Sequence, residues 1–138
     1  MRWLLDTVAV SATRRPERTL AEVIRWLEAQ NPFSLYVSAI TMFELELGTR
    51  RKEVSDPVQG ADLRACVERV SEAFVGRILS VDEQVAVRAA SLHIPDPKPE
   101  RDALMAATAY VHNLTVVTRN TRDFQTLDVR IHNPWMEG

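Results

Sequence analysis

A run of five residues near the C-terminus, Leu114-Thr115-Val116-Val117-Thr118, constrains the fold of this chain more than any other segment. Its β-branched residues are continuous, which is typical of a strand. A strand without regular polar alternation is buried on both faces, and such strands belong to parallel sheets that helices cover on each side. The segment therefore predicts an α/β fold with a mainly parallel central sheet.

Shorter apolar segments elsewhere extend this pattern of strands and helices. We expect strands at 2–5, 35–37 and 77–81, and helices at 17–30, 38–50, about 63–74, 85–92 and 100–110. Right-handed crossovers between parallel strands place the helices on both faces, in a three-layer α/β/α arrangement. Ligands of such folds bind outside the carboxyl ends of the strands.

The length of 138 residues corresponds to one domain, 1–138, because no glycine-rich or proline-rich linker divides the chain. Its 17 basic and 19 acidic residues give a net charge of −2, so any contact with nucleic acid must be local. A single cysteine, Cys66, allows no internal disulfide, and neither a signal peptide nor a membrane-spanning run is present. A cytoplasmic location without membrane contact is the expectation.

Three carboxylates stand where the predicted architecture would bring them together. Asp6 follows the first strand, Glu44 lies on the helix after the second strand, and Asp102 begins the last long helix. Converging carboxylates repel one another unless a cation lies between them. Hard oxygen ligands without a cysteine cluster favour Mg²⁺ or Mn²⁺, and His93, His112 and His132 lack the spacing of a zinc site.

The helix that carries Glu44 separates two nearby acids. Glu44 and Glu46 are two positions apart, about 200° around a helix, so they face opposite sides. We expect Glu44 on the buried side with Ile40, Phe43 and Leu47, where an acid needs a partner, and Glu46 on the outward side, where it needs none.

Four segments in order carry a family resemblance. They are LLDT at 4–7, SAITMFELELG at 38–48, DALMAATA at 102–109 and VTRNTRDF at 117–124. With these segments the chain resembles PIN-domain proteins of the VapC/FitB toxin type. The resemblance implies an Mg²⁺-dependent endoribonuclease that is the toxic half of a toxin–antitoxin pair, with Asp6, Glu44 and Asp102 matching the metal-binding acids.

The fourth acidic position of the family is divided here between two residues. Related sequences place it at the position of Asn120 or three residues later, where this chain has Asp123. We expect Asp123 to supply the catalytic charge and Asn120 to orient a water or ligand. Val8 is a second departure, since the family commonly has asparagine there.

Further side chains near the strand ends are candidates for supporting roles. Thr7 and Thr118 could hydrogen-bond to Asp6, a metal-bound water or a phosphate. Arg119 and Arg122 could contact phosphate through their guanidinium groups.

The resemblance also implies partners. These are an RNA substrate, a cognate antitoxin that places a basic side chain among the acids, DNA only through that antitoxin, and a second copy of the chain. The homodimer expectation also rests on apolar side chains expected at the surface: Trp26, Phe33, Tyr36 and Trp135. Val8 and Asn120 keep an alternative open, in which a catalytically weak PIN domain acts as a binding module in an antitoxin–DNA regulatory complex.

Overall fold

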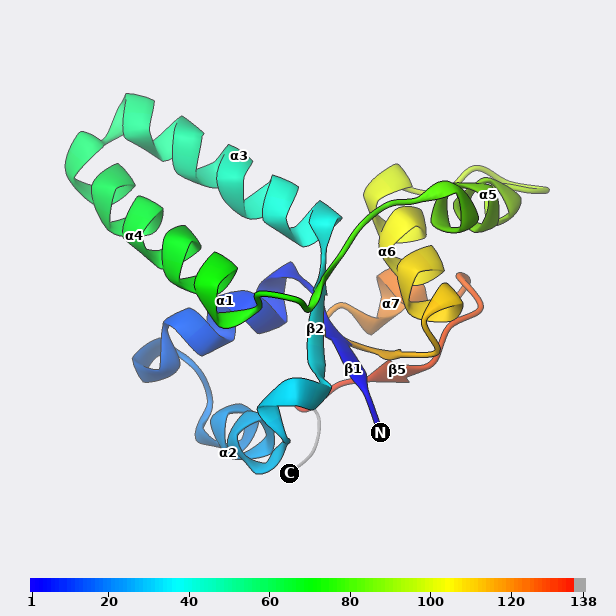
Figure 1. Ribbon diagram of the computed structural model, residues 1–138, viewed down its shortest axis with the longest axis horizontal. Coiled ribbons are helices and arrows are strands. Elements are labelled where there is room, and N and C mark those ends of the chain that lie inside the picture. The colour runs from blue at the N-terminus through cyan, green and yellow to red at the C-terminus, as the bar shows by residue number, and fades with distance from the viewer. Residues whose placement is uncertain (136–138) are drawn as a thin grey trace.

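The computed structural model describes residues 1–135, and a five-stranded parallel sheet runs through its centre (Figure 1). The strand order is β3-β2-β1-β4-β5, and every neighbouring pair is parallel. The strands are β1 (Trp3–Leu5), β2 (Leu35–Ser38), β3 (Ile78–Leu79), β4 (Thr115–Val117) and β5 (Ile131–His132). The predicted mainly parallel sheet is confirmed.

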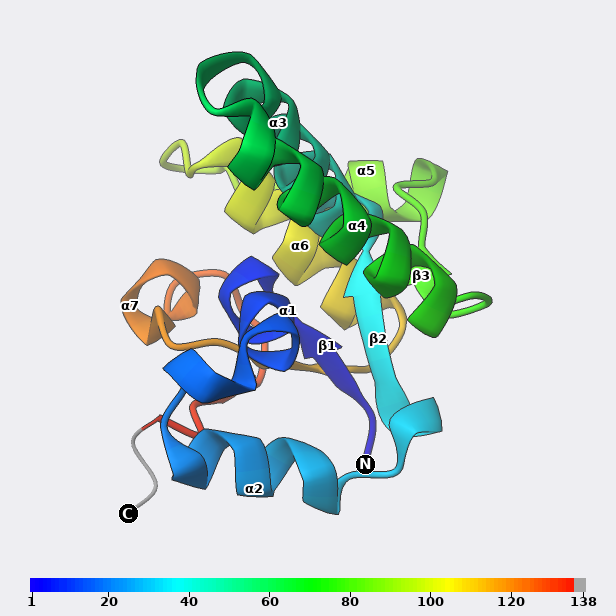
Figure 2. The same ribbon diagram turned by 90° about the vertical axis from the view of Figure 1, so that its left-hand side faces the viewer.

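Helices cover both faces of the sheet, as Figure 2 shows from the side. Alternate residues of β1 and β4 point to opposite faces of the sheet. Leu5 and Val117 pack in one core with α1, α2 and α4. Leu4 and Val116 pack in the other core with α6 and α7. The helices are α1 (Thr7–Arg14), α2 (Ala21–Ala29), α3 (Ala39–Ser55), α4 (Pro57–Ala73), α5 (Glu83–Ser91), α6 (Glu100–Val111) and α7 (Thr121–Phe124). The three-layer prediction is therefore also confirmed.

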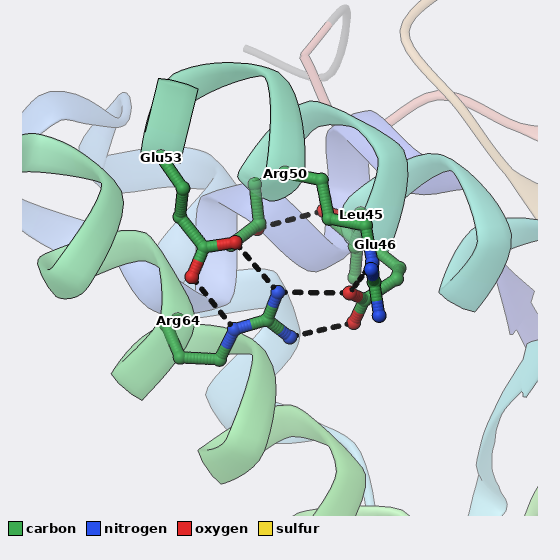
Figure 3. Close-up of polar contacts among 6 residues, drawn as sticks. Leu45, Glu46, Arg50, Glu53 and Arg64 are labelled. Carbon is green, nitrogen blue, oxygen red and sulfur yellow. Dashed lines mark hydrogen bonds and ion pairs between the residues drawn. The ribbon is translucent and has the colours of Figure 1, made fainter. Parts of the chain in front are cut away.

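Helices α3 and α4 form a long hairpin that projects to one side of the sheet (Figure 1). Arg64 of α4 makes a bidentate contact with Glu46 at 2.7 and 2.8 Å and also binds Glu53, both on α3 (Figure 3). Glu46 binds Arg50 one turn further along the same helix. Glu46 was expected on the outward side of α3, and this side faces α4, so the acid is paired with arginines.

The buried side of α3 also differs from the prediction. Thr41, Leu45 and Thr49 are buried at a spacing of four residues, while the Phe43 side chain is 52% exposed. A helix packed between the sheet edge and α4 buries a narrow stripe of small and medium side chains, which excludes Phe43.

Two differences concern the N-terminal third of the chain. Helix α1 was not predicted, because its buried residues, Ala9, Val10 and Ala12, give a weak apolar pattern. The predicted helix 17–30 is divided into a short 3-10 turn, Pro16–Arg18, and α2, because Thr19 is extended between them.

The aromatic side chains expected at the surface are mostly packed against the protein. Trp26 lies edge-on to Trp3, with ring centroids 4.9 Å apart, and both rings lie near His132. Trp135, like Trp26, packs against the core that contains Leu5, and Tyr36 packs against the core that contains Leu4. The Phe33 side chain is 76% exposed. No helix within residues 1–135 has the length and apolar character needed to cross a membrane.

Candidate active site

Asp6 lies at the carboxyl edge of the sheet, where β1 ends and α1 begins. Its backbone N–H donates to the Val117 carbonyl at 3.0 Å and continues the pairing of β1 with β4. Its Oδ1 accepts from the Ala9 N–H at 2.8 Å, so the carboxylate caps α1. The residue is 5% exposed, and burial raises the pKa of its carboxyl group because the charged form loses water.

Thr118 fixes the other side of this carboxylate. Leu5 and Val117 are paired in register, so the residues that follow them, Asp6 and Thr118, are neighbours. The fully buried Thr118 side chain hydrogen-bonds to Asp6, which offsets part of the effect of burial on the Asp6 pKa. Its Oγ1 also accepts from the Asn120 N–H at 2.9 Å, which ties the following loop to the same point.

Glu44 approaches Asp6 from the second turn of α3. Its Oε1 accepts a 2.6 Å hydrogen bond from the Thr7 hydroxyl, and its Oε2 lies 3.6 Å from the Arg101 guanidinium. Arg101 in turn stacks 4.9 Å from the centre of the Phe43 ring, which helps to explain why that exposed ring is retained beside the acid. Both oxygens of Glu44 therefore have protein partners.

Asp102 lies in the first turn of α6, close enough to other acids for their charges to affect its pKa. Burial raises the pKa of Asp102, and the negative charges of Asp123 and Glu44 raise it further. Glu44 raises the pKa of Asp6 in the same way. The structure thus brings together four carboxylates from four different elements at the carboxyl edge of the sheet.

Asn120 and Asp123 are placed differently with respect to this group. Asp123 lies in the first turn of α7, near enough for its charge to act on Asp102. Asn120 precedes α7, and its carbonyl accepts from the Asp123 N–H at 3.1 Å. Its own side chain is exposed and makes no capping bond to the helix.

The basic side chains near the site also differ in position. Arg119 and Arg122 are exposed, and Arg119 lines a hollow that includes Val8. Arg101 is the residue that the sequence analysis missed. Its signal in the sequence is its position directly before Asp102, at the start of a helix that otherwise carries small apolar residues.

The donor types of this site fit a hard divalent cation, because all four side chains offer carboxylate oxygen. A cation would also offset the repulsion that raises the pKa of Asp102. As the side chains lie, however, no group of three or more His, Cys, Asp or Glu residues within 1–135 is arranged to hold a metal ion. The contacts with Thr7 and Arg101, rather than a shared cation site, determine the position of the Glu44 side chain.

The comparisons with known proteins agree with this arrangement, since residues 3–129 match the family model of the PIN domain. The chain belongs to the PIN-domain family. The FitB toxin of Neisseria gonorrhoeae is 36% identical over 96% of this chain and 97% of the toxin. The VapC ribonuclease Y4jK of Sinorhizobium fredii is 31% identical over 96% of each chain.

Solved structures show the same relationship. This PIN domain matches the crystal structure of FitAcB from Neisseria gonorrhoeae with a TM-score of 0.86 and 35% identity, over 98% of this chain and 99% of that chain. It matches FitAB bound to an IR36 DNA fragment with a TM-score of 0.79 and 33% identity, over 99% and 97% of the two chains. The family predicted from the four sequence segments is confirmed.

Proposed function

We propose that this PIN domain is a metal-dependent endoribonuclease that hydrolyses RNA phosphodiester bonds as the toxic component of a toxin–antitoxin pair. The observation that carries the proposal is the meeting of Asp6, Glu44 and Asp102, with Asp123 beside them, at one edge of the sheet. Relatives that span nearly the whole chain support it, because they are named a toxin and a ribonuclease.

Mg²⁺ is the proposed cofactor, with Mn²⁺ as the alternative, and Asp6, Glu44 and Asp102 are the residues that would hold it. When bound, such a cation lowers the pKa of a coordinated water and offsets charge on the phosphoryl oxygens. Glu44 would then exchange its contact with Arg101 for the cation, while Thr7 continues to orient it.

The remaining residues of the site would orient the Asp6 carboxylate and bind the substrate. The Ala9 N–H and Thr118 hold the Asp6 carboxylate from two sides, which fixes its orientation. Arg101 and Arg119 are the cations that would bind the phosphodiester, because a guanidinium forms bidentate contacts with phosphate. The exposed Asn120 amide would orient a water or the substrate by hydrogen bonding.

The proposed partners are a cognate antitoxin, an RNA substrate and a second copy of the chain. Structures of the FitAB assembly bound to a DNA fragment and of a toxin–antitoxin complex from Klebsiella pneumoniae support an antitoxin partner, and the first supports DNA binding by such a complex. Of the apolar residues expected at a dimer surface, Phe33 is the one whose 76% exposure favours such a contact.

A second candidate function is a catalytically weak binding module in an antitoxin–DNA complex. Two observations favour it: Val8 stands where the family commonly has asparagine, and Glu44 is engaged by Thr7 and Arg101 rather than directed at a shared cation site. The four coupled acids weigh against it, because a binding module gains nothing from repulsive charges at this edge.

A cleavage assay on structured total RNA tests the two functions against each other. Purified parent protein and Asp6→Asn are compared with Mg²⁺, with Mn²⁺ and with EDTA. We expect discrete fragments that require metal, and a loss of at least roughly 100-fold in the variant, since even outer-shell changes cost about 10–100-fold. Equal cleavage by both proteins would refute the assignment of the site, and no cleavage by folded parent protein would favour the binding module.

A further inference from the structure

A hollow of about 660 Å³ lies along α1. Val8, Arg15, Arg119 and Trp135 line it. Val8 follows Asp6 by two residues and Arg119 follows Thr118, so this hollow begins next to the pair that anchors the acidic site.

The hollow continues along α1 into two smaller ones. The next, of about 300 Å³, shares Arg15 with the first, and the last, of about 350 Å³ between α1 and α4, shares Arg14 and Arg69 with the second. Figure 2 shows α1 flanked by α2 and α4 along this path. We call these three adjacent hollows, which share lining residues, the arginine groove, after Arg14, Arg15, Arg69 and Arg119.

The arginines of the groove lack the carboxylate partners that others have. Arg50, Arg64, Arg88 and Arg101 form ion pairs, whereas no ion pair involving an arginine of the groove is found among the described residues. The groove itself contains two acids, Glu17 and Asp62, against its four arginines. Its net charge therefore favours an anionic ligand, although the whole chain is slightly acidic.

Arg14 gives the strongest indication that the groove favours an anion. Its Nε is buried and has no hydrogen-bond partner among the described residues, and the Arg69 guanidinium is engaged only by the Cys66 sulfur, at 3.1 Å. Burial lowers the pKa of Arg14, an effect that Cys66 opposes, and the neighbouring charges of Arg15 and Arg69 lower it further. A phosphate at this end would offset the repulsion between these like charges.

The opposite end of the groove combines cations with apolar surface. Val8 is 36% exposed and Leu20 is 55% exposed, and the partly buried Trp135 ring lies beside them. Single-stranded nucleic acid is bound in this way, by guanidinium groups along the backbone and by aromatic or apolar surface against the bases.

We propose that the arginine groove binds a single-stranded segment of RNA adjacent to the phosphodiester that is cleaved. A base occupies the hollow of Val8 and Trp135, and the backbone follows Arg119 and Arg15 toward Arg14 and Arg69. The proposal rests on the nuclease function proposed above. It also gives Val8 a role, since an apolar side chain contacts a base where asparagine would have offered an amide.

The test is RNA binding without cleavage, measured by fluorescence anisotropy in EDTA with a labelled single-stranded RNA of mixed sequence. Arg15→Gln, Arg69→Gln and Arg119→Gln each remove one positive charge of the groove. Arg25→Gln is the matched control, because Arg25 is exposed on α2 and lies outside the groove. We expect each groove variant to weaken binding about threefold to tenfold and to reduce the slope of log K against log salt by about 0.7, with no change for the control.

The outcomes separate this proposal from the nuclease assignment. Groove-dependent binding without cleavage in either Mg²⁺ or Mn²⁺ supports the groove and refutes the nuclease. Metal-dependent cleavage with equal binding by groove variants and control overturns the groove and assigns it to a protein partner instead. Absence of RNA binding by the folded parent chain at low salt also overturns the groove. Circular dichroism of each variant establishes that it is folded.

Discussion

The Thr7 hydroxyl donates a 2.6 Å hydrogen bond to Oε1 of Glu44, 37 positions further along the chain. The bond joins the first turn of α1 to the second turn of α3. It orients Glu44 from the same segment that presents Asp6, so two acids of the site share one positioning element.

Replacement of Thr7 tests this positioning. Thr7→Val preserves the shape of the side chain but removes the donor, so Glu44 would be held by Arg101 alone. We expect RNA cleavage to fall about 10-fold to 100-fold, the usual cost of losing a partner of a metal-binding side chain. Thr7→Ser keeps the hydroxyl and should retain most of the activity. Equal activity of the valine and serine variants would show that the hydrogen bond does not position Glu44.

The raised pKa of Asp6 predicts that the site destabilises the metal-free protein. The folded chain holds this proton more tightly than the unfolded chain, so stability is greatest below the ordinary pKa of 3.8 and falls as pH rises through the folded value. Asp6→Asn keeps the cap of α1. At pH 7 in EDTA we expect it to be more stable than the parent by roughly 0.5–2 kcal/mol.

Thermal unfolding at several pH values checks this expectation. The difference between Asp6→Asn and the parent should disappear toward pH 3, where Asp6 is protonated in both states. Added Mg²⁺ should stabilise the parent more than the variant, because a ligand stabilises the form that binds it. A variant that melts below the parent at pH 7 in EDTA would contradict the prediction.

The contact of Arg64 with Glu46 predicts the opposite dependence on pH. Hydrogen bonds from Arg64 and Arg50 lower the pKa of Glu46 from 4.5 to about 2. Its contribution to stability is therefore complete above the ordinary value and is lost as pH falls toward 2. Arg64→Gln should melt below the parent at pH 7, and this difference should shrink between pH 4.5 and 2. Arg51→Gln, an exposed change on α3, should track the parent throughout, and a gap for Arg64→Gln that is independent of pH would exclude the ionic origin.

Two helical glycines form a matched pair for testing the α3–α4 hairpin. A Cβ on Gly60 would lie 2.5 Å from the Cα of Glu53, whereas a Cβ on Gly48 would meet nothing within 4 Å. Gly60→Ala should therefore destabilise the protein by about 1–3 kcal/mol, because the two helices must move apart. Gly48→Ala should stabilise it by about 0.5–1 kcal/mol through its helix propensity. Urea unfolding measures both, and equal effects would mean that the helices do not approach closely at Gly60.

The sequence predicted the parallel sheet without its short edge strand β5, because its strongest strand, at 114–118, has a composition typical of a strand buried on both faces. Asp6, Glu44 and Asp102 could be placed at one edge because each follows a strand or begins a helix at a recognisable point. The family resemblance, carried by consecutive residues, was equally accessible.

Other features depend on contacts that local pattern does not contain. The partner of Glu46 is Arg64, 18 positions away on a separate helix, and the exposure of Phe43 follows from where α4 packs. Helix α1 buries mainly small residues, so its apolar pattern is weak. The arginine groove is formed by α1, α4 and the segments at 15–20, 119 and 135, whose proximity only the folded chain reveals.

Glu44 and Glu46 lie in one turn of α3, so the helix carries an acid of the site on one side and the anchor of α4 on the other. Arg64 joins the two helices through its contacts with Glu46 and Glu53. Displacement at the tip of the hairpin, at Asp56, would thus be transmitted through this turn to the carboxylate that Thr7 and Arg101 hold. A molecule that binds the hairpin outside the sheet layers would therefore act on the acidic site without contacting it.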